Sequence, residues 1–401
     1  MRLLNVIRSV DPASGGMAEG LRQSVLATRA MGHVEEVLTL DAPHEAWVRS
    51  FPATTHAIGP AAGLYGHSQQ LVPWLRDNAQ RYDAVVVHGL WQFHSLAVHR
   101  ALRAGPVPYF IYPHGMLDPW FKRRYPLKHL KKWLYWPWAD YRVLRDAAAV
   151  LFTAAEEARL AAQSFWLYRA KPAVVGYGVA LGDPALLGSA EEFAAAWPQT
   201  RGKRIALFMS RLHPKKGGDL LIEAFAQIAD SAPELHLVMA GPDGSGVRAE
   251  LEALAERLGV AHRITWTGML SGSAKWSALK AAEVFVLPSH QENFGIVVVE
   301  ALAMGVPVLI SDKVNIWREI VDGGAGFAAS DTAAGTVECL QGWLKLTEAQ
   351  RSAMKLRAAA CYQQHFHMAA AARRLIDTIT PHAGGAPLEP ALIASAVNSR
   401  P

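Results

Sequence analysis

Two glutamates, eight positions apart, are the strongest candidates for functional side chains in this sequence. Glu292 stands in a stretch that reads as a loop, and Glu300 stands in the apolar segment that follows it. If the segment is helical throughout, a rise of about 1.5 Å per residue separates the carboxylates by about 12 Å along the axis. A nucleotide sugar could lie across that length, with its sugar at one glutamate, its ribose at the other and its diphosphate between them. The alternative is a pair of solvated glutamates on an amphipathic helix.

The stretch that holds these glutamates reads as a strand, a helix and a second strand. Short apolar runs at residues 283–288 and 306–310 are typical of buried strands. The helix is expected to begin near residues 293–295 and to stop at Gly305, where a residue without Cβ can adopt the left-handed conformation. Ligands of such βαβ units bind at the carboxyl ends of the strands, where the helix N-terminus directs unpaired N–H groups outward.

Two cations follow another predicted strand. Residues 205–209 form its apolar run, and Arg211 and Lys216 come just before the next helix, where their charge adds to the positive end of the helix dipole. Fixed cations suit a diphosphate, because the leaving phosphate gains negative charge when its bond to the sugar breaks. The alternative is an ordinary solvated basic loop.

Two features of the first half also lie at expected strand ends. Gly15 and Gly16 follow a strand at residues 3–10, and a glycine turn there lets backbone amides approach a phosphate, although most such turns only change the chain direction. His114 follows a strand at residues 107–112. It could hydrogen-bond a sugar hydroxyl or, when protonated, stabilise developing charge. A histidine that satisfies a loop carbonyl is the alternative.

Strand and helix patterns alternate along the whole chain. Further strands are expected at residues 34–40, 82–88, 149–153, 173–176, 236–241 and 263–268 and around residue 327. This alternation predicts an α/β fold with doubly wound parallel sheets. A chain of 401 residues is long enough for two domains with a core each.

The segment PSHQENFGIVVVEALAMGVPV resembles the signature of the family-4 retaining glycosyltransferases, in which seven residues separate two glutamates. The match covers the proline-ended strand, the Phe-Gly pair, both glutamates, the helix end and the Pro-Val strand. The resemblance implies the GT-B fold, with two Rossmann-like domains that face a cleft. The expected parts are an acceptor domain (1–178), a linker (179–203), a donor domain (204–365), a helix that crosses back to the first domain (366–380) and a loosely ordered tail (381–401).

The resemblance also implies roles for particular residues. The donor is expected to bind at Gly15, Gly16, Arg211, Lys216, Met269, Leu270, Glu292, Asn293, Phe294, Gly295 and Glu300, and the catalytic residues are expected to be His114, Glu292, Arg211 and Lys216. A hexose would pass from a UDP- or GDP-linked donor to a saccharide with retention of configuration, while a phosphate oxygen takes the proton of the acceptor hydroxyl. No metal and no cofactor beyond this co-substrate is expected, in keeping with the lack of an Asp-x-Asp at a strand end.

Residues 120–138 have the most unusual composition in the chain, with six Lys or Arg and seven aromatic residues interleaved. We expect this segment to bind an anionic membrane surface or the acceptor, because aromatics settle at headgroup level and basic residues are attracted to anionic lipid. The expected surface residues are Lys122, Arg123, Arg124, Lys128, Lys131, Lys132, Trp133 and Trp136. The alternative is a core helix with solvated lysines. The preceding HGMLDPW resembles bacterial exopolysaccharide glycosyltransferases, whose acceptors are often polyprenyl-diphosphate-linked.

Composition and charge limit the compartment and the partners. The net charge of +5 and pI near 9.1 allow an anionic substrate or membrane surface without requiring nucleic acid, which we do not expect as a partner. Two cysteines cannot form a disulfide framework, which indicates a reducing compartment. Arg8 interrupts the short apolar run at the N-terminus, so a signal peptide is not expected. No apolar run approaches the roughly 20 residues needed to span a bilayer. A cytoplasmic protein is expected, with peripheral attachment to the inner membrane left open.

Three other functions share parts of this pattern. A nicotinamide-dependent oxidoreductase would use the same doubly wound sheet but needs a glycine fingerprint and an acidic ribose partner, neither of which is clear here. A non-catalytic nucleotide-sugar-binding protein would keep the fold without needing the basic pair. A transferase could also act on a soluble or small-molecule acceptor.

Overall fold

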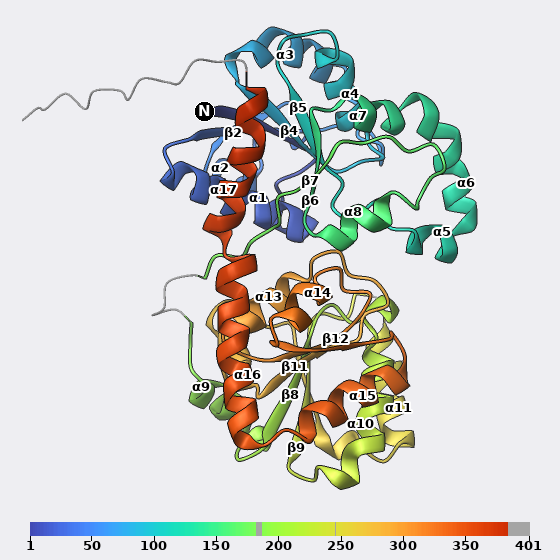
Figure 1. Ribbon diagram of the computed structural model, residues 1–401, viewed down its shortest axis with the longest axis vertical. Coiled ribbons are helices and arrows are strands. Elements are labelled where there is room, and N and C mark those ends of the chain that lie inside the picture. Colours follow the sequence, from blue (N-terminus) through green and yellow to red (C-terminus); the bar gives the residue numbers. More distant parts are fainter. Residues whose placement is uncertain (182–186, 245, 384–401) are drawn as a thin grey trace, which may run out of the picture.

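A computed structural model describes residues 1–181, 187–244 and 246–383 of the chain. These residues form two domains, one above the other in Figure 1, and each domain has a parallel sheet with helices on both faces. The expected α/β fold with two Rossmann-like domains is therefore confirmed. The tail predicted for residues 381–401 lies outside the described residues from position 384 onward.

The first sheet has the strand order β3-β2-β1-β4-β5-β6-β7, and all its neighbouring strands are parallel. Its strands are β1 (Arg2–Ile7), β2 (Val34–Thr39), β3 (Thr54–Ala57), β4 (Ala84–His88), β5 (Tyr109–Tyr112), β6 (Ala149–Phe152) and β7 (Pro172–Val174). The order reverses between β1 and β4, which is where ligands bind in sheets of this type. The strand β3 was not predicted, because TTHA is short and lacks a clear apolar pattern.

The helices of the first domain cover both faces of this sheet (Figure 1). They are α1 (Gly16–Ala30), α2 (Ala46–Arg49), α3 (Leu71–Asn78), α4 (Phe93–Leu102), α5 (Trp120–Arg124), α6 (Pro126–Tyr135), α7 (Asp140–Asp146) and α8 (Ala155–Ala161). The glycine turn predicted at residues 15 and 16 leads directly into α1, and Gly15 adopts a φ of 88°, a conformation that favours glycine.

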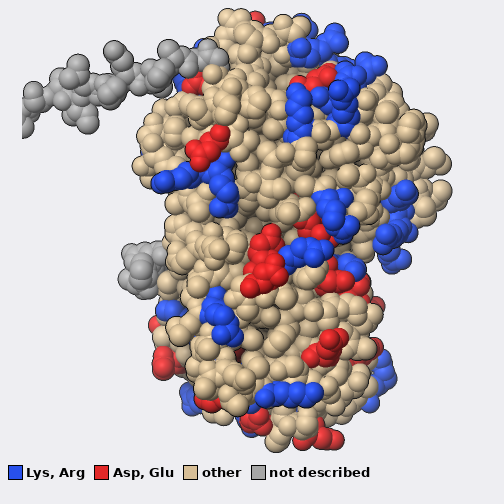
Figure 2. All heavy atoms as spheres, viewed as in Figure 1, with Lys and Arg blue, Asp and Glu red and all other residues tan. Residues whose placement is uncertain are grey.

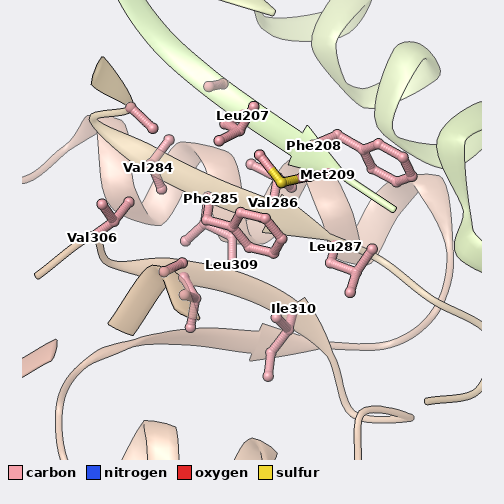
Figure 3. Close-up of a cluster of buried hydrophobic side chains, with 14 of the residues drawn as sticks. Leu207, Phe208, Met209, Val284, Phe285, Val286, Leu287, Val306, Leu309 and Ile310 are labelled. Carbon is pink, nitrogen blue, oxygen red and sulfur yellow. The ribbon is translucent and has the colours of Figure 1, made fainter. Parts of the chain in front are cut away.

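The second sheet has the order β10-β9-β8-β11-β12-β13, again with parallel neighbours. Its strands are β8 (Arg204–Met209), β9 (Leu235–Ala240), β10 (Ile264–Gly268), β11 (Val284–Leu287), β12 (Val308–Ser311) and β13 (Gly326–Ala329). Figure 3 shows side chains of β8, β11 and β12 packed together in the core. Because both faces of a parallel sheet are buried, these strands are continuously apolar, which is why the sequence revealed them.

The helices of the second domain are α9 (Ala190–Ala196), α10 (Gly218–Ile228), α11 (Val247–Arg257), α12 (Gly272–Ala281), α13 (Ile296–Ala303), α14 (Trp317–Asp322), α15 (Ala333–Leu344) and α16 (Glu348–Cys361). The helix α13 begins after Gly295 and its chain reverses at Gly305, both with a positive φ. Glu292 precedes α13 and forms an isolated bridge with Val314. The segment between the two glutamates is therefore not helical throughout. The estimate of about 12 Å assumed a continuous helix and does not apply.

The chain crosses between the domains twice at one place. Val179 pairs with His367 in an isolated parallel bridge, and the last helix, α17 (Met368–Ile379), follows at once. Leu375, Ile376 and Ile379 of α17 are buried in a core cluster of the first domain. The C-terminal helix therefore packs on the first domain, and Figure 1 shows α16 and α17 running end to end past both sheets.

Candidate functional site

The carboxyl ends of the second sheet face the first domain and bring two loops into contact. The loop after β8 contains the short 3-10 turn Pro214–Lys216, and Gly217 follows it with a φ of 69°. A Cβ atom on Gly217 would lie 2.3 Å from the carbonyl oxygen of Pro288, at the end of β11. Only glycine allows this close approach, which places the basic loop beside the loop that carries Glu292.

Lys216 and Glu292 form an ion pair across these two loops, and their side chains are 12% and 20% exposed. Arg211, after the same strand β8, is exposed and has no hydrogen-bond or ion-pair partner in the described part of the chain. The structure thus brings three predicted residues to one edge of the sheet, with one cation free to bind an anion.

Lys215 is a further cation of this site that the sequence analysis did not single out. Its Nζ lies 5.6 Å from the ring centre of Trp120 and 5.4 Å from that of Phe121, both on α5 of the first domain. Burial lowers the pKa of Lys215, and the nearby carboxylates of Glu292 and Asp118 act in the opposite direction. The double lysine in the sequence was the available signal, but the interdomain contact depends on the tertiary structure.

Glu300 is buried on α13, with 8% of its side chain exposed, and pairs with Lys275 on α12 at 2.6 Å. Burial raises the pKa of Glu300, while the ammonium group of Lys275 favours its charged form. The solvated-surface alternative is therefore wrong for Glu300. Lys275 is a second missed residue, because no spacing in the sequence links it to the glutamate 25 positions later.

The start of α13 lies against two loops of the first domain. Asn293 Nδ2 donates to Thr153 Oγ1 at 3.1 Å, and a Cβ atom on Gly115 would lie 2.7 Å from the Cβ of Asn293. A Cβ on Gly16 would lie 2.9 Å from Ile296 Cδ1. The predicted glycine turn and the His-Gly strand end therefore both meet the start of this helix, with Gly295 in the left-handed conformation at its N-cap.

His114 lies after β5 with a φ of 48°, and its ring stacks on Tyr112 and hydrogen-bonds to the ring of His88. The ring centres of Tyr112 and His88 are 5.1 and 5.4 Å away, and that of Tyr177 is 5.9 Å away in a T-shaped contact. Tyr177 in turn contacts Phe294 at 5.4 Å. Burial lowers the pKa of His114 to about 4. A neutral histidine that hydrogen-bonds a substrate fits this environment better than a protonated one.

Two cavities open on either side of this interdomain contact. One, of about 640 Å³, is lined by Glu19, Arg22, Leu181, Lys275, Trp276 and Glu300. The other, of about 470 Å³, is lined by Trp120, Arg123, Glu156, Asn315, Trp317 and Arg318 among others. Asn315 is 1% exposed, and its Oδ1 has no hydrogen-bond partner in the described residues. Figure 2 shows acidic and basic side chains meeting at this waist.

Met269 and Leu270, predicted to border the base, follow β10 at the same edge of the sheet. Met269 is 70% exposed, whereas Leu270 packs against the core of the second domain. Both precede α12, the helix that carries Lys275. Their backbone groups therefore lie on the side of the cleft where Glu300 is found, although neither residue lines the 640 Å³ cavity.

The basic and aromatic segment divides into an outer and an inner face. Lys122, Arg123, Arg124, Lys128 and Lys131 are exposed. The prediction is wrong for Trp136, which is fully buried, stacks on Phe165 at 4.1 Å and donates from Nε1 to the carbonyl oxygen of Leu167.

Lys132 and Trp133 also turn toward the domain. Lys132 Nζ lies 4.2 Å from the ring centre of Trp91, and burial lowers the pKa of Lys132 to about 8. Trp133 stacks on Trp166 at 5.5 Å. The outer face contains instead three leucines that the sequence analysis overlooked, Leu127, Leu130 and Leu134, with exposed fractions of 78%, 60% and 74%. Their i, i+3, i+7 spacing was the available signal.

A search of the described residues finds no cluster of three or more His, Cys, Asp or Glu side chains arranged to hold a metal ion. None of the helices in the described part is both long and apolar enough to cross a bilayer.

Two family models match the two halves of the chain. The description "Glycosyl transferase 4-like domain" covers residues 15–178, and "Glycosyl transferases group 1" covers residues 189–359. Together the matched ranges include Gly15, His114, both cations after β8 and both glutamates.

Curated proteins with similar sequences include two D-inositol 3-phosphate glycosyltransferases. The protein from Streptomyces avermitilis is 28% identical over 333 residues, which are 80% of this chain and 62% of the relative. The protein from Streptomyces scabiei is 34% identical over 197 residues, 47% of this chain and 44% of the relative. The chain thus spans less than two thirds of the length of either.

Solved structures share the fold along nearly the whole chain. Sucrose-phosphate synthase from Thermosynechococcus elongatus has a TM-score of 0.74 at 18% identity, over 95% of this chain and 98% of that one. Anabaena Alr3699/HepE, solved in complex with UDP and glucose, has a TM-score of 0.72 at 20% identity, over 95% of this chain and 100% of that one.

Proposed function

The chain belongs to the family-4 glycosyltransferases of GT-B fold, and we propose that it transfers a hexose from a nucleoside-diphosphate sugar to a saccharide acceptor. The observation that carries the proposal is the Lys216–Glu292 pair beside Arg211, at the sheet edge that faces His114. Arg211 and Lys216 hold the diphosphate, Glu292 and the backbone of Phe294 and Gly295 hold the sugar, and Glu300 holds the ribose. UDP in the complexes of the Anabaena protein, which shares the fold, supports a nucleotide in this cleft.

Charge explains why this edge suits the departure of a nucleoside diphosphate. Lys215 and Lys216 stand just before the N-terminus of α10, with Arg211 in the same loop, and the helix dipole adds positive potential there. Negative charge grows on the leaving phosphate as the bond to the sugar breaks, and cations already in place stabilise it without reorganising. When the diphosphate replaces Glu292 as the partner of Lys216, the Glu292 carboxylate becomes free to accept hydrogen bonds from sugar hydroxyls.

The proposed reaction retains the configuration of the anomeric carbon and needs no metal. The bond between that carbon and the phosphate oxygen breaks, and the acceptor oxygen bonds to the same face of the sugar. The proton of the acceptor hydroxyl goes to the departing phosphate oxygen, so the enzyme itself needs no general base. The cations of the β8 loop neutralise the charge that a metal ion would otherwise offset.

The two cavities suggest how the substrates share the cleft. The 640 Å³ cavity contains Glu300 and Lys275 and takes the nucleoside. The 470 Å³ cavity contains Gln291, next to Glu292, and opens toward Trp120 and Arg123 on α5, so it takes the acceptor. The buried Asn315 offers an unpaired oxygen there to an acceptor hydroxyl.

The surface beside the acceptor cavity supports a lipid-linked acceptor, such as a polyprenyl-diphosphate saccharide of cell-surface polysaccharide synthesis. Leu127, Leu130 and Leu134 form an exposed apolar stripe on α6, next to Lys128 and Lys131. Figure 2 shows basic side chains at the edge where Figure 1 places α5. An apolar stripe with basic neighbours matches the interface of an anionic bilayer. We infer peripheral attachment to the cytoplasmic face of the inner membrane.

A nucleotide panel tests the donor part. Thermal unfolding is measured with UDP, GDP, ADP, CMP and TDP, with and without EDTA, and the nucleotide that stabilises the protein then identifies the donor sugars to assay. A ligand that binds only the native state stabilises it, by about 2.7 kcal/mol when the ligand concentration is one hundred times Kd, and so raises the melting temperature. We expect one nucleotide to raise the melting temperature by the same amount with and without EDTA. Transfer from the corresponding nucleotide sugar should then give a product with the donor's anomeric configuration.

Other outcomes would overturn parts of the proposal. Binding without hydrolysis or transfer, even with extracted bacterial lipid-linked acceptors, would favour a non-catalytic nucleotide-sugar-binding protein. Efficient transfer to free sugars, without vesicle binding, would contradict the lipid-linked acceptor and leave the donor site intact. If NAD, added to the same assay, stabilised the protein and none of the five nucleotides did, the transferase would be contradicted.

A further inference from the structure

Four polar side chains form one hydrogen-bonded row across the first sheet and end at His114. Glu35 on β2, Asn5 on β1, His88 at the end of β4 and His114 after β5 come from four strands that are neighbours in the sheet. The distances along the row are 2.6 Å from Asn5 Nδ2 to Glu35 Oε2, 3.0 Å from His88 Nε2 to Asn5 Oδ1, and 3.1 Å between His88 Nδ1 and His114 Nε2. The first three residues are 6%, 2% and 5% exposed.

The chemistry of these groups gives the row a direction. A carboxylate oxygen can only accept, so the amide Nδ2 of Asn5 donates to Glu35 and its Oδ1 is left to accept from His88 Nε2–H. Burial and the neighbouring histidines hold the pKa of His88 well below its usual range, so its ring carries a single hydrogen. His88 Nδ1 is then a bare acceptor, and the hydrogen between the two histidines belongs to His114 Nε2.

Protonation of Glu35 need not reverse this direction. Burial raises the pKa of Glu35, and its Oε1 is buried without a partner, whereas Oε2 contacts Asn5. A hydrogen on Oε1 leaves Oε2 free to accept from Asn5 Nδ2. The row keeps its direction whenever Glu35 Oε2 carries no hydrogen.

The other ring nitrogen of His114 is available to a ligand. His114 Nδ1 makes no hydrogen bond to any described residue, and it is not among the buried polar atoms that lack a partner. Stacking on Tyr112, the hydrogen bond to His88 and the left-handed backbone of His114 fix the ring plane. A Cβ atom on Gly115, the next residue, would lie 2.7 Å from Asn293 at the start of α13, so His114 stands beside the contact between the domains.

We propose that Glu35, Asn5 and His88 are positioning residues that hold His114 in the tautomer with hydrogen on Nε2, so that its Nδ1 accepts a hydrogen bond from a sugar hydroxyl. The inference rests on the proposed function for the identity of the ligand, but the tautomer itself is a property of the free protein. The contacted position of the sugar must carry an O–H group, because a bare Nδ1 repels a group that can only accept.

Nitrogen NMR of the full-length protein labelled with ¹⁵N-histidine tests the tautomer without any substrate. Long-range ¹H–¹⁵N spectra distinguish a protonated from an unprotonated ring nitrogen, and His114→Gln assigns the signals. We expect Nε2 protonated and Nδ1 unprotonated near neutral pH. A hydrogen on Nδ1, or on both nitrogens, would overturn the proposal, whatever happens to the proposed transferase activity.

Two variants test the positioning role. Asn5→Leu removes both contacts of Asn5, so His88 can reverse and His114 should show a mixture of tautomers. His88→Asn keeps an acceptor oxygen near His114 Nε2 and should shift the tautomer less. His99→Asn is the matched control, since His99 is another buried histidine of this domain, paired with Asp146 at 2.9 Å. The His99→Asn variant should leave the His114 signals unchanged. A change in those signals as large as the one caused by Asn5→Leu would show that the Asn5 effect is purely structural.

Kinetics with the active donor connect the tautomer to the sugar. Asn5→Leu should lower kcat/KM by about tenfold, the cost of one misdirected hydrogen bond. Among donors in which fluorine replaces single hydroxyls, one should bind wild type at least tenfold more weakly, because fluorine cannot donate, and Asn5→Leu should reduce that discrimination. Equal discrimination by wild type and Asn5→Leu would contradict the role. Loss of all transfer in wild type with the expected tautomer present would instead contradict the proposed function alone.

Discussion

The carboxylate of Glu300 on α13 is held by the ammonium group of Lys275 on α12, with 2.6 Å between Oε1 and Nζ. Glu300 is 6% exposed, and burial raises its pKa. An ionised carboxylate at this depth is unfavourable without a partner. The ammonium group of Lys275 therefore favours the charged form of Glu300, which lines the larger cavity of the interdomain cleft.

Replacement of Lys275 by Met should weaken both the fold and nucleotide binding. The substitution leaves the Glu300 carboxylate buried and unpaired, which costs about 1–3 kcal/mol after allowance for the partial exposure of Lys275. Urea unfolding and calorimetric titration with the nucleotide would measure the two effects. The double variant Lys275→Met, Glu300→Leu should recover most of the stability without recovering the affinity. Recovery of both would show that the pair has only a structural role.

Lys216→Ala should reduce turnover at least tenfold, because the leaving phosphate loses a fixed cation. Glu300→Ala should do the same through loss of the ribose contact. Steady-state assays with the identified donor measure both. Lys203→Ala is a matched control, since Lys203 is exposed just before the opposite end of β8. Wild-type turnover in either site variant would refute the corresponding assignment.

Trp120→Leu should raise the donor KM more than it lowers kcat. The ring of Trp120 faces Lys215 across the domain interface, and such a contact between a cation and an aromatic ring is worth about 0.5–2 kcal/mol. Its loss allows the basic loop more freedom before the diphosphate binds. An increase of about two- to thirtyfold in KM is expected from that energy. A change in kcat alone would place Trp120 at the reacting atoms instead.

Binding to vesicles should depend on the exposed stripe of α6. The triple variant Leu127→Ser, Leu130→Ser, Leu134→Ser should abolish co-sedimentation with anionic vesicles. The double variant Lys128→Gln, Lys131→Gln should weaken it by about thirtyfold, at roughly 1 kcal/mol for each basic residue. Leu356→Ser is the control, because Leu356 is a comparably exposed leucine, 76%, on α16 of the second domain. Equal binding by the triple variant and the control would refute the membrane surface.

Stability should fall as the pH drops below neutrality. Burial lowers the pKa of His94 to about 4, whereas an unfolded histidine titrates near about 6.5. Between these values the unfolded state binds the extra proton, so the free energy of unfolding rises with pH and is lost as pH falls toward 4. His94 alone contributes at most about 3 kcal/mol. Urea unfolding from pH 4.5 to 7.5 should show a shallower slope in His94→Gln; an unchanged slope would contradict this.

Local patterns determined the fold to a large extent. The strands β8, β11 and β12 contain continuous apolar runs, so they could be located from the sequence within about two residues, as expected for element boundaries. The strand β3 could not, because TTHA carries no apolar pattern, and only the tertiary structure shows its pairing with β2. The burial of Trp136 was not predicted either, because the aromatic ring that it stacks on, Phe165, lies 29 residues away in the sequence.

The sequence by itself determined the family, the two parallel sheets and the residue types at the strand ends, because these depend on periodicity and on contiguous motifs. Only the tertiary structure decided the partners. Lys275 beside Glu300, Lys215 against Trp120, and the row from Glu35 to His114 join residues from separate elements. Such contacts depend on how strands and helices pack, and no local spacing encodes them. The protonation and pairing of the site therefore follow from packing, whereas its chemical groups follow from the sequence.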